Sequence, residues 1–269
     1  MNKRKKDRIG EINYNKLNNK MEIIKYVSCN EVYIYFEKYD YIKKVTYQQF
    51  KNKEVVCPYE PRTYGKGYLG EGKYKTRNIN GKPTKCYDRW KKMLQRCYDP
   101  KFHEKQPAYK DCTVCEEWLN FQNFAEWYHK HYYEVPGERM HLDKDILNKG
   151  NKIYSPENCI FVPQRINDLF VKRQNDRGDS PIGVYFRKGE NKYRAQCNRF
   201  YKSRYIGDFN NEMEAFEYYK IIKENHIKNV IDSYEGVIPN KYYHKLKEAI
   251  YNYKVEIDDW IDWSSHRIS

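Results

Sequence analysis

The chain has 269 residues, of which 51 are Lys or Arg and 37 are Asp or Glu, so its formal net charge at pH 7 is +14. That excess favours a polyanionic partner, and the length suits two or three domains of about 50–150 residues each. No stretch approaches the roughly 18 consecutive apolar residues of a membrane span, and no apolar run follows the basic start, so we expect neither a membrane partner nor a secretory signal.

Three short runs rich in β-branched and aromatic residues predict a small antiparallel sheet over residues 21–27, 31–36 and 41–47. The glycine-rich residues 64–72 follow. They lack a Gly-Lys-Ser/Thr ending and a strand-to-helix context, so we interpret them as a loop or linker and not as a phosphate cradle. Residues 1–72 are therefore predicted to be a small β module with its linker.

Apolar residues then recur at helical spacing in two segments. One helix is predicted around Trp90, over residues 87–97, and a second over residues 118–128. In both segments the aromatic residues lie on one side of the helix, which favours packing in a core over stacking on bases.

The chain has eight cysteines, and without an export signal we do not expect a disulfide framework. Cys112 and Cys115 have ligand-like spacing, but a structural zinc site needs four ligands. Cys86, Cys97 or His103 would have to complete the set. We therefore favour reduced, packed thiols over structural zinc.

A strand over residues 141–147, a turn-rich segment, a second strand over 159–162 and a helix over 164–173 predict a ββα unit. Cleaving a phosphodiester requires a divalent ion, a base for water and an orienting group. The ends of these elements offer Asp143 with Lys144, then Asn158, then Asn167. Asp143 and Asn167 are oxygen ligands suited to Mg²⁺, and Asn158 would orient its neighbour.

In type and order, Asp143, Asn158 and Asn167 resemble the signature of the HNH endonucleases, particularly the phage-encoded homing type. The resemblance implies a general-base histidine directly after the aspartate, where this chain has Lys144. Strand alternation would place the substitutes His141 and Asp145 on the side of residue 143, opposite residue 144.

A structural role is open for each of these residues as well. Asn158 would cap the turn after Ser155. The carboxylates Asp143 and Asp145 would pair with cations of the same unit, for which the candidates are Lys144, Lys149 and Arg165.

A polar linker over residues 172–179 leads to strands near 183–187, 192–198 and 202–209 and a helix over 211–230. Alternation predicts that Tyr193, Ala195 and Cys197 face the helix, whereas Arg194, Gln196 and Asn198 face outward. Arginine can read guanine bidentately, and Gln or Asn can read adenine.

The Gly-Val start at 183, the Ile-Gly-Asp-Phe turn at 206 and the Glu-Ala-Phe helix start at 214 resemble the ethylene-response-factor (Apetala-type) DNA-binding domain. That resemblance implies a three-stranded sheet in the major groove with a helix behind it. The DNA-binding residues expected from alternation, charge and resemblance together are Tyr185, Arg187, Lys188, Arg194, Gln196, Asn198, Lys202, Arg204 and Tyr205.

We thus expect an α+β multidomain chain. Its predicted parts are the small antiparallel β module, a helical plus ββα HNH-like unit over 73–175, a three-stranded sheet packed on one helix over 180–232, and a helical tail over 233–269. The leading hypothesis is a sequence-specific, Mg²⁺-dependent endonuclease of homing type that acts on double-stranded DNA in the cytoplasm of a bacterial host. The alternatives are a non-catalytic phage DNA-binding regulator and, from the abundance of Tyr, an RNA-binding protein.

Overall fold

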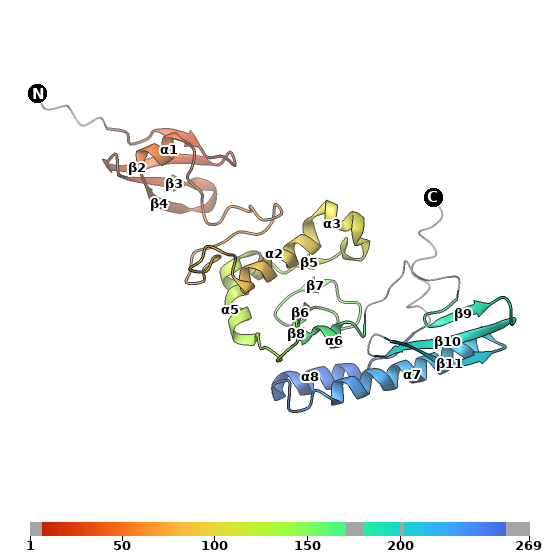
Figure 1. The fold of residues 1–269 in the computed structure, drawn as a ribbon. Helices are drawn as coiled ribbons and strands as arrows, with labels where there is room; N and C mark the ends of the chain where they lie inside the picture. Colours follow the sequence, from red (N-terminus) through yellow and green to blue (C-terminus); the bar gives the residue numbers. More distant parts are fainter. Residues whose placement is uncertain (1–6, 171–179, 200–201, 257–269) are drawn as a thin grey trace, which may run out of the picture. The chain divides into compact units, whose positions relative to one another are not determined.

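The computed structural model describes residues 7–170, 180–199 and 202–256, and it divides into two compact units, residues 1–130 and 131–269 (Figure 1). The division falls inside the segment 73–175, which the sequence treats as one part. In those described ranges no helix combines the length and the apolar character that crossing a bilayer requires.

The first unit begins with a four-stranded antiparallel sheet in the order β1-β2-β3-β4. Its strands are β1 (Ile12–Tyr14), β2 (Lys20–Ser28), β3 (Glu31–Phe36) and β4 (Tyr41–Val45), with a 3₁₀ turn η1 (Glu37–Tyr39) and a helix α1 (Tyr47–Lys51). Alternate residues of β2 and β3, such as Met21, Ile23 and Ile34, are fully buried. The predicted N-terminal sheet is therefore confirmed. The elements β1, η1 and α1 were not predicted, because each is very short.

After a long loop, helices make up most of the rest of the first unit. They are α2 (Lys85–Tyr98), α3 (Pro100–Lys105), the 3₁₀ turn η2 (Pro107–Tyr109), α4 (Glu116–Leu119) and α5 (Phe121–His131), with the short strand β5 (Thr113–Val114) between them. Trp90 and Trp118 are fully buried, and the indole Nε1 of Trp90 donates to the Trp118 carbonyl at 2.7 Å. Core packing of the aromatic residues is thus confirmed. The expected single helix over 118–128 is interrupted at Asn120, whose side chain accepts the Gln122 N–H at 3.0 Å.

The second unit begins with a strand–strand–helix arrangement. Strands β6 (Met140–Asp143) and β8 (Ile160–Pro163) are antiparallel, with Asp143 opposite Ile160, and helix α6 (Gln164–Asn167) follows directly. The two-residue strand β7 (Ile153–Tyr154) lies between them in sequence. The first strand is shorter than predicted, because it ends at Asp143. The helix predicted to reach residue 173 ends at Asn167, and residues 171–179 lie outside the described part.

A three-stranded antiparallel sheet in the order β11-β10-β9 follows, made of β9 (Val184–Arg187), β10 (Lys192–Arg199) and β11 (Lys202–Phe209). Helix α7 (Glu212–Asp232) packs on one side of it, and α8 (Asn240–Tyr251) packs on α7 (Figure 1). Ala195 and Cys197 are buried against Phe216 and Tyr219 of α7. The predicted three-stranded sheet packed on a helix is confirmed. Helix α8 lies within the tail predicted to be helical, of which residues 257–269 are outside the described part.

Candidate functional site

Asp143 ends strand β6 and turns the chain into the loop that follows. Its Oδ1 accepts two backbone N–H groups, from Asp145 at 2.8 Å and from Ile146 at 2.7 Å. A carboxylate that bonds the backbone two and three residues later stabilises a turn in the way that Asx turns do. Asp143 therefore has a structural role besides any chemical one, and that role involves neither Lys149 nor Arg165.

The pKa of the Asp143 carboxyl is raised to about 7. Burial is the main cause, and the negative charge of Asp145 adds to it; the two backbone N–H bonds act in the opposite direction. Near neutral pH this carboxyl group therefore gains or loses a proton readily. A cation placed beside both carboxylates would relieve their repulsion.

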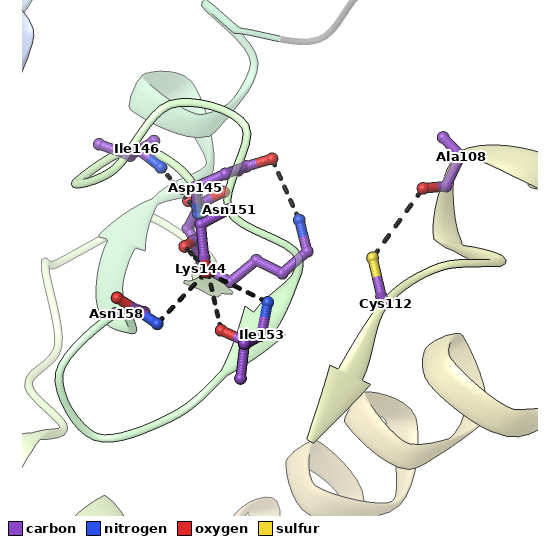
Figure 2. A network of polar contacts seen from close by, with 9 residues as sticks. Ala108, Cys112, Lys144, Asp145, Ile146, Asn151, Ile153 and Asn158 are labelled. Carbon is purple, nitrogen blue, oxygen red and sulfur yellow. Dashed lines mark hydrogen bonds and ion pairs between the residues drawn. The ribbon is translucent and has the colours of Figure 1, made fainter. Parts of the chain in front are cut away.

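Lys144 is almost fully buried, with an exposed fraction of 7%. Its ammonium lies 3.1 Å from Oδ2 of Asp145 (Figure 2). It also lies 5.8 Å from the ring centroid of Tyr154. A buried ammonium needs such a partner, since an unpaired charge in the interior is costly. Burial alternates from Met140 to Asp145, with Lys144 buried and Asp145 exposed, and the charge of Asp145 acts on Asp143, as alternation predicts. Of the pairings considered for the two carboxylates, that of Asp145 with Lys144 is present. Lys149 instead pairs with Glu256 at 2.8 Å.

A network of side-chain amides holds the loop after Lys144 (Figure 2). Asn151 donates to the carbonyls of Lys144 and Ile153 at 2.7 and 2.8 Å. Asn158 donates to Oδ1 of Asn151 at 3.3 Å and accepts from Asn148 at 3.0 Å. Asn158 thus belongs to the loop network through both ends of its amide.

The capping role considered for Asn158 is reversed in the structure. The Asn158 backbone N–H donates to the Ser155 hydroxyl at 3.4 Å, so Ser155 provides the capping oxygen. The importance of Asn148 and Asn151 was missed, because both were interpreted only as turn residues. Asn148 and Asn151 are three residues apart in a turn that contains Gly150, and this spacing could have predicted that their side chains hold the loop.

Asn167 is the last residue of α6, a helix that packs on both β6 and β8. Within the described residues, the amide of Asn167 makes no hydrogen bond to Asp143 or Asn158. The structure therefore joins Lys144, Asp145 and Asn158 through the loop network and leaves Asn167 outside it. The described ranges also hold no group of three or more His, Cys, Asp or Glu side chains placed to bind a metal ion.

The cysteines considered as zinc ligands are packed among other groups of the first unit. Cys86, Cys97 and Cys112 are buried, and the Cys112 thiol lies 3.9 Å from the Ala108 carbonyl (Figure 2). His103, a possible fourth ligand, has its Nε2 2.8 Å from the Arg96 carbonyl. The Cys112 thiol and the His103 ring therefore each have a polar contact within the protein.

The open face of the three-stranded sheet is the side away from α7. Arg194 lies opposite Tyr185 on β9 and Asp208 on β11, and Gln196 lies opposite Tyr205. Residues directly opposite in an antiparallel pair project to the same side. Tyr205 is 63% exposed and Tyr185 is 39% exposed. Alternation therefore places these aromatic, basic and amide groups together, as the sequence predicts.

Arg194 is held within this face by Asp208. Its Nε and Nη2 donate to the two carboxylate oxygens at 2.6 Å each, and its guanidinium lies 4.9 Å from the ring centroid of Tyr205. The ion pair raises the pKa of Arg194 and lowers the pKa of Asp208. A guanidinium has five N–H donors, so the two bonds to Asp208 leave donors for other groups, and Tyr185 is one such partner. Sequence reasoning missed Asp208, although its register opposite Arg194 could have been inferred from the hairpin.

The other predicted DNA-binding residues are distributed differently. Arg187 is on the open face and pairs with Glu190 at 2.5 Å, and Lys188 is exposed in the turn after β9.

Arg204 lies opposite Cys197, so it projects to the helix side, away from Arg194. Asn198 and Lys202 take part in the β10–β11 ladder, and their side chains lie outside the described part.

No protein-family model, no curated protein and no solved structure matches this chain. The chemistry of the described side chains is therefore what supports a function.

Proposed function

We propose that the protein binds double-stranded DNA through the open face of β9–β11 and cleaves it with Mg²⁺ beside Asp143, as an HNH-type endonuclease of the homing kind. The register of the sheet is the observation that carries the binding half of this proposal. It groups Tyr185, Arg194, Gln196 and Tyr205 on one side, with the apolar residues on the other. A two- or three-stranded ribbon of this kind is narrow enough to enter the major groove.

The charge of the chain supports the same partner. A net charge of +14 in a chain without a membrane-length helix in its described part suits a polyanion. Gln196 and Arg194 are groups that read base edges, whereas Arg187 and Lys188 suit phosphates.

The carboxylate pair supports the cleavage half. Asp143 and Asp145 are close enough for the charge of one to raise the pKa of the other. Carboxylate and amide oxygens suit Mg²⁺, so Asp143, with Asp145 or Asn167, would hold the ion. Bound Mg²⁺ would polarise the scissile phosphate. Asp143 would bind the ion, and the loop network through Asn158 would keep Asp143 and Lys144 in place.

A plasmid-nicking assay tests this proposal. We expect wild-type protein to nick supercoiled DNA with Mg²⁺ and to stop with EDTA. Asp143→Asn keeps an oxygen for the two backbone N–H bonds but loses the charge, so it should bind DNA normally and fail to cleave. Asn167→Ala should also reduce cleavage. An equal, EDTA-resistant background of nicking in all three proteins would contradict the proposed cleavage activity.

A salt titration tests the binding half separately. Several phosphate contacts should weaken binding to a duplex by about 10³-fold or more between 50 and 200 mM salt. An affinity that hardly changes with salt, or a preference for single-stranded RNA over duplex DNA at fixed salt, would contradict it.

A second function, non-catalytic DNA binding, is favoured by the environment of Lys144. The HNH resemblance implies a histidine there, but Lys144 is buried and paired with Asp145, and Asn158 uses both ends of its amide within the loop. On this proposal the protein binds DNA without cutting under any divalent metal. Lys144→His then separates the two proposals: new activity in this variant alone would mean that the wild-type site has lost its base.

A further inference from the structure

The segment that leads to α2, residues 62–84, is a largely exposed loop with a well-defined base. Gln122 of α5 accepts the Tyr74 N–H at 3.0 Å and donates to the Tyr74 carbonyl at 3.1 Å. Gly70 and Gly72 lie so close to the side chains of Asn120 and Gln122 that a Cβ would meet them at 2.2 and 2.3 Å. Two isolated β-bridges, Thr63 with Gly67 and Arg77 with Pro83, close the loop further.

The tip of this loop is a tight turn built around Asn78. Its Oδ1 accepts the N–H groups of Asn80 and Lys82, both at 3.0 Å, and its backbone N–H donates to the Lys82 carbonyl at 2.9 Å. Arg77 donates to the Gly81 carbonyl at 2.5 Å, which closes the turn from the other side. The tip is therefore ordered by its own hydrogen bonds and presents a fixed surface.

Ile79 is at the centre of this turn, and its exposed fraction is 102%, the highest among the exposed large apolar residues of the described part. No part of its own unit covers it. A β-branched apolar side chain loses little conformational freedom when it is buried by a partner, because its χ1 angle is already restricted. The position therefore suits insertion into another molecule.

Positive charge surrounds the tip. Residues 62–85 include seven Lys or Arg and one carboxylate, that of Glu71, which accepts the Tyr41 hydroxyl at 2.6 Å. All seven cations are exposed. Six of them have no ion pair among the described residues: Arg62, Lys66, Lys73, Lys75, Arg77 and Lys82.

We propose that the tip at Ile79 is a wedge that enters the minor groove of duplex DNA and partly unstacks one base step, while Arg77 and Lys82 contact the flanking phosphates. The inference rests on the proposed DNA-binding function and adds a second contact surface to it. Apolar wedges flanked by cations are the usual means by which proteins kink a duplex from the minor groove. Unpaired cations without neighbouring carboxylates complement phosphates, and a single apolar side chain is too small an area to hold a protein partner or a bilayer.

The test uses the full chain and a duplex selected by wild-type protein from random sequence, with a fluorescent adenine analogue placed in turn at each step. We expect wild-type binding to raise the fluorescence at one step, because the base there becomes unstacked. Ile79→Ala should abolish that rise and weaken binding about tenfold, with the salt dependence unchanged. Lys82→Gln should lower the slope of log affinity against log salt by about one.

Ile42→Ala is the matched control, because Ile42 is 53% exposed on β4 of the same unit. It should bind and unstack DNA as the wild type does. If Ile79→Ala retains the fluorescence rise, the wedge is wrong while DNA binding stands. If wild-type protein binds no duplex, the proposed function and the wedge both fail. Ile79-dependent binding to vesicles of anionic lipid, without unstacking of DNA, would also overturn the wedge.

Discussion

Strands β10 and β6 both carry residues proposed to act on DNA, but they differ in what holds those residues. β10 has eight residues, pairs with a strand on each side and is backed by α7, so its side chains alternate between core and open face over most of its length. β6 has four residues and ends at Asp143, and hydrogen bonds of side chains then shape the loop.

The difference shows where alternation is a reliable guide. The ladder with β11 sets the direction of Arg194 and Gln196, and β9 pairs with the strand as far as Ala195, so both side chains lie where the sequence predicts. The ladder between β6 and β8 ends at Asp143, and the Lys144 ammonium pairs with the carboxylate of the next residue, Asp145. The effects of substitutions on stability and DNA binding should therefore differ between the two regions, both in magnitude and in physical cause.

The largest effect should come from the core behind the sheet. Phe216 of α7 is 2% exposed and packs against the helix-facing residues of β10. Phe216→Ala should lower the free energy of unfolding by about 3–5 kcal/mol, since it removes a buried ring and leaves a cavity. Urea denaturation measures this. Ile221→Ala, at an exposed position of the same helix, should change stability by less than about 0.5 kcal/mol, and an equal loss in both variants would contradict the packing.

The loop after β6 should respond to hydrogen-bond loss. Asp143→Ala leaves two backbone N–H groups without their acceptor and should cost about 1–3 kcal/mol. Asp143→Asn keeps the acceptor and should cost less, which the same denaturation experiment measures. If both variants were equally destabilised, the turn would not depend on the side-chain oxygen.

The same residue predicts a pH dependence. In the folded protein the pKa of Asp143 is raised from 3.8 to about 7, so the protonated form is favoured by folding. Its contribution to stability is complete below about pH 4 and is lost as the pH rises towards 7. Asp143→Asn has no such charge, so its stability relative to wild type should increase between pH 4 and 7. A difference that is constant over this range would contradict the raised pKa.

The smallest effect should come from the ion pair on the open face. Arg194 and Asp208 are partly exposed, at 24% and 18%, and a double-mutant cycle with Arg194→Ala and Asp208→Ala should give a small favourable coupling, because solvent screens the pair. In DNA binding, Asp208→Asn should reduce discrimination for guanine at one position, because Arg194 loses the partner that orients it. An unchanged base preference would mean that Arg194 does not read a base.

The sequence by itself determined the features that depend on neighbouring residues. The period of two around Tyr193, Ala195 and Cys197 predicted the sheet, its helix-facing side and its open side. The helical spacing around Trp90 predicted a buried aromatic face. Each of these is a local property, because strand and helix geometry relate residues only a few positions apart.

The tertiary structure alone decided where strand β6 ends, which of the cations considered pairs with Asp145 and which carboxylate holds Arg194. Asp208 is 14 residues from Arg194, and the Asn151–Asn158 contact joins the two sides of a turn. The fold brings such groups together through turns and loops whose conformation no local sequence pattern specifies. The burial, ion pairs and hydrogen bonds of the candidate site depend on these loops, so only the folded structure reveals them.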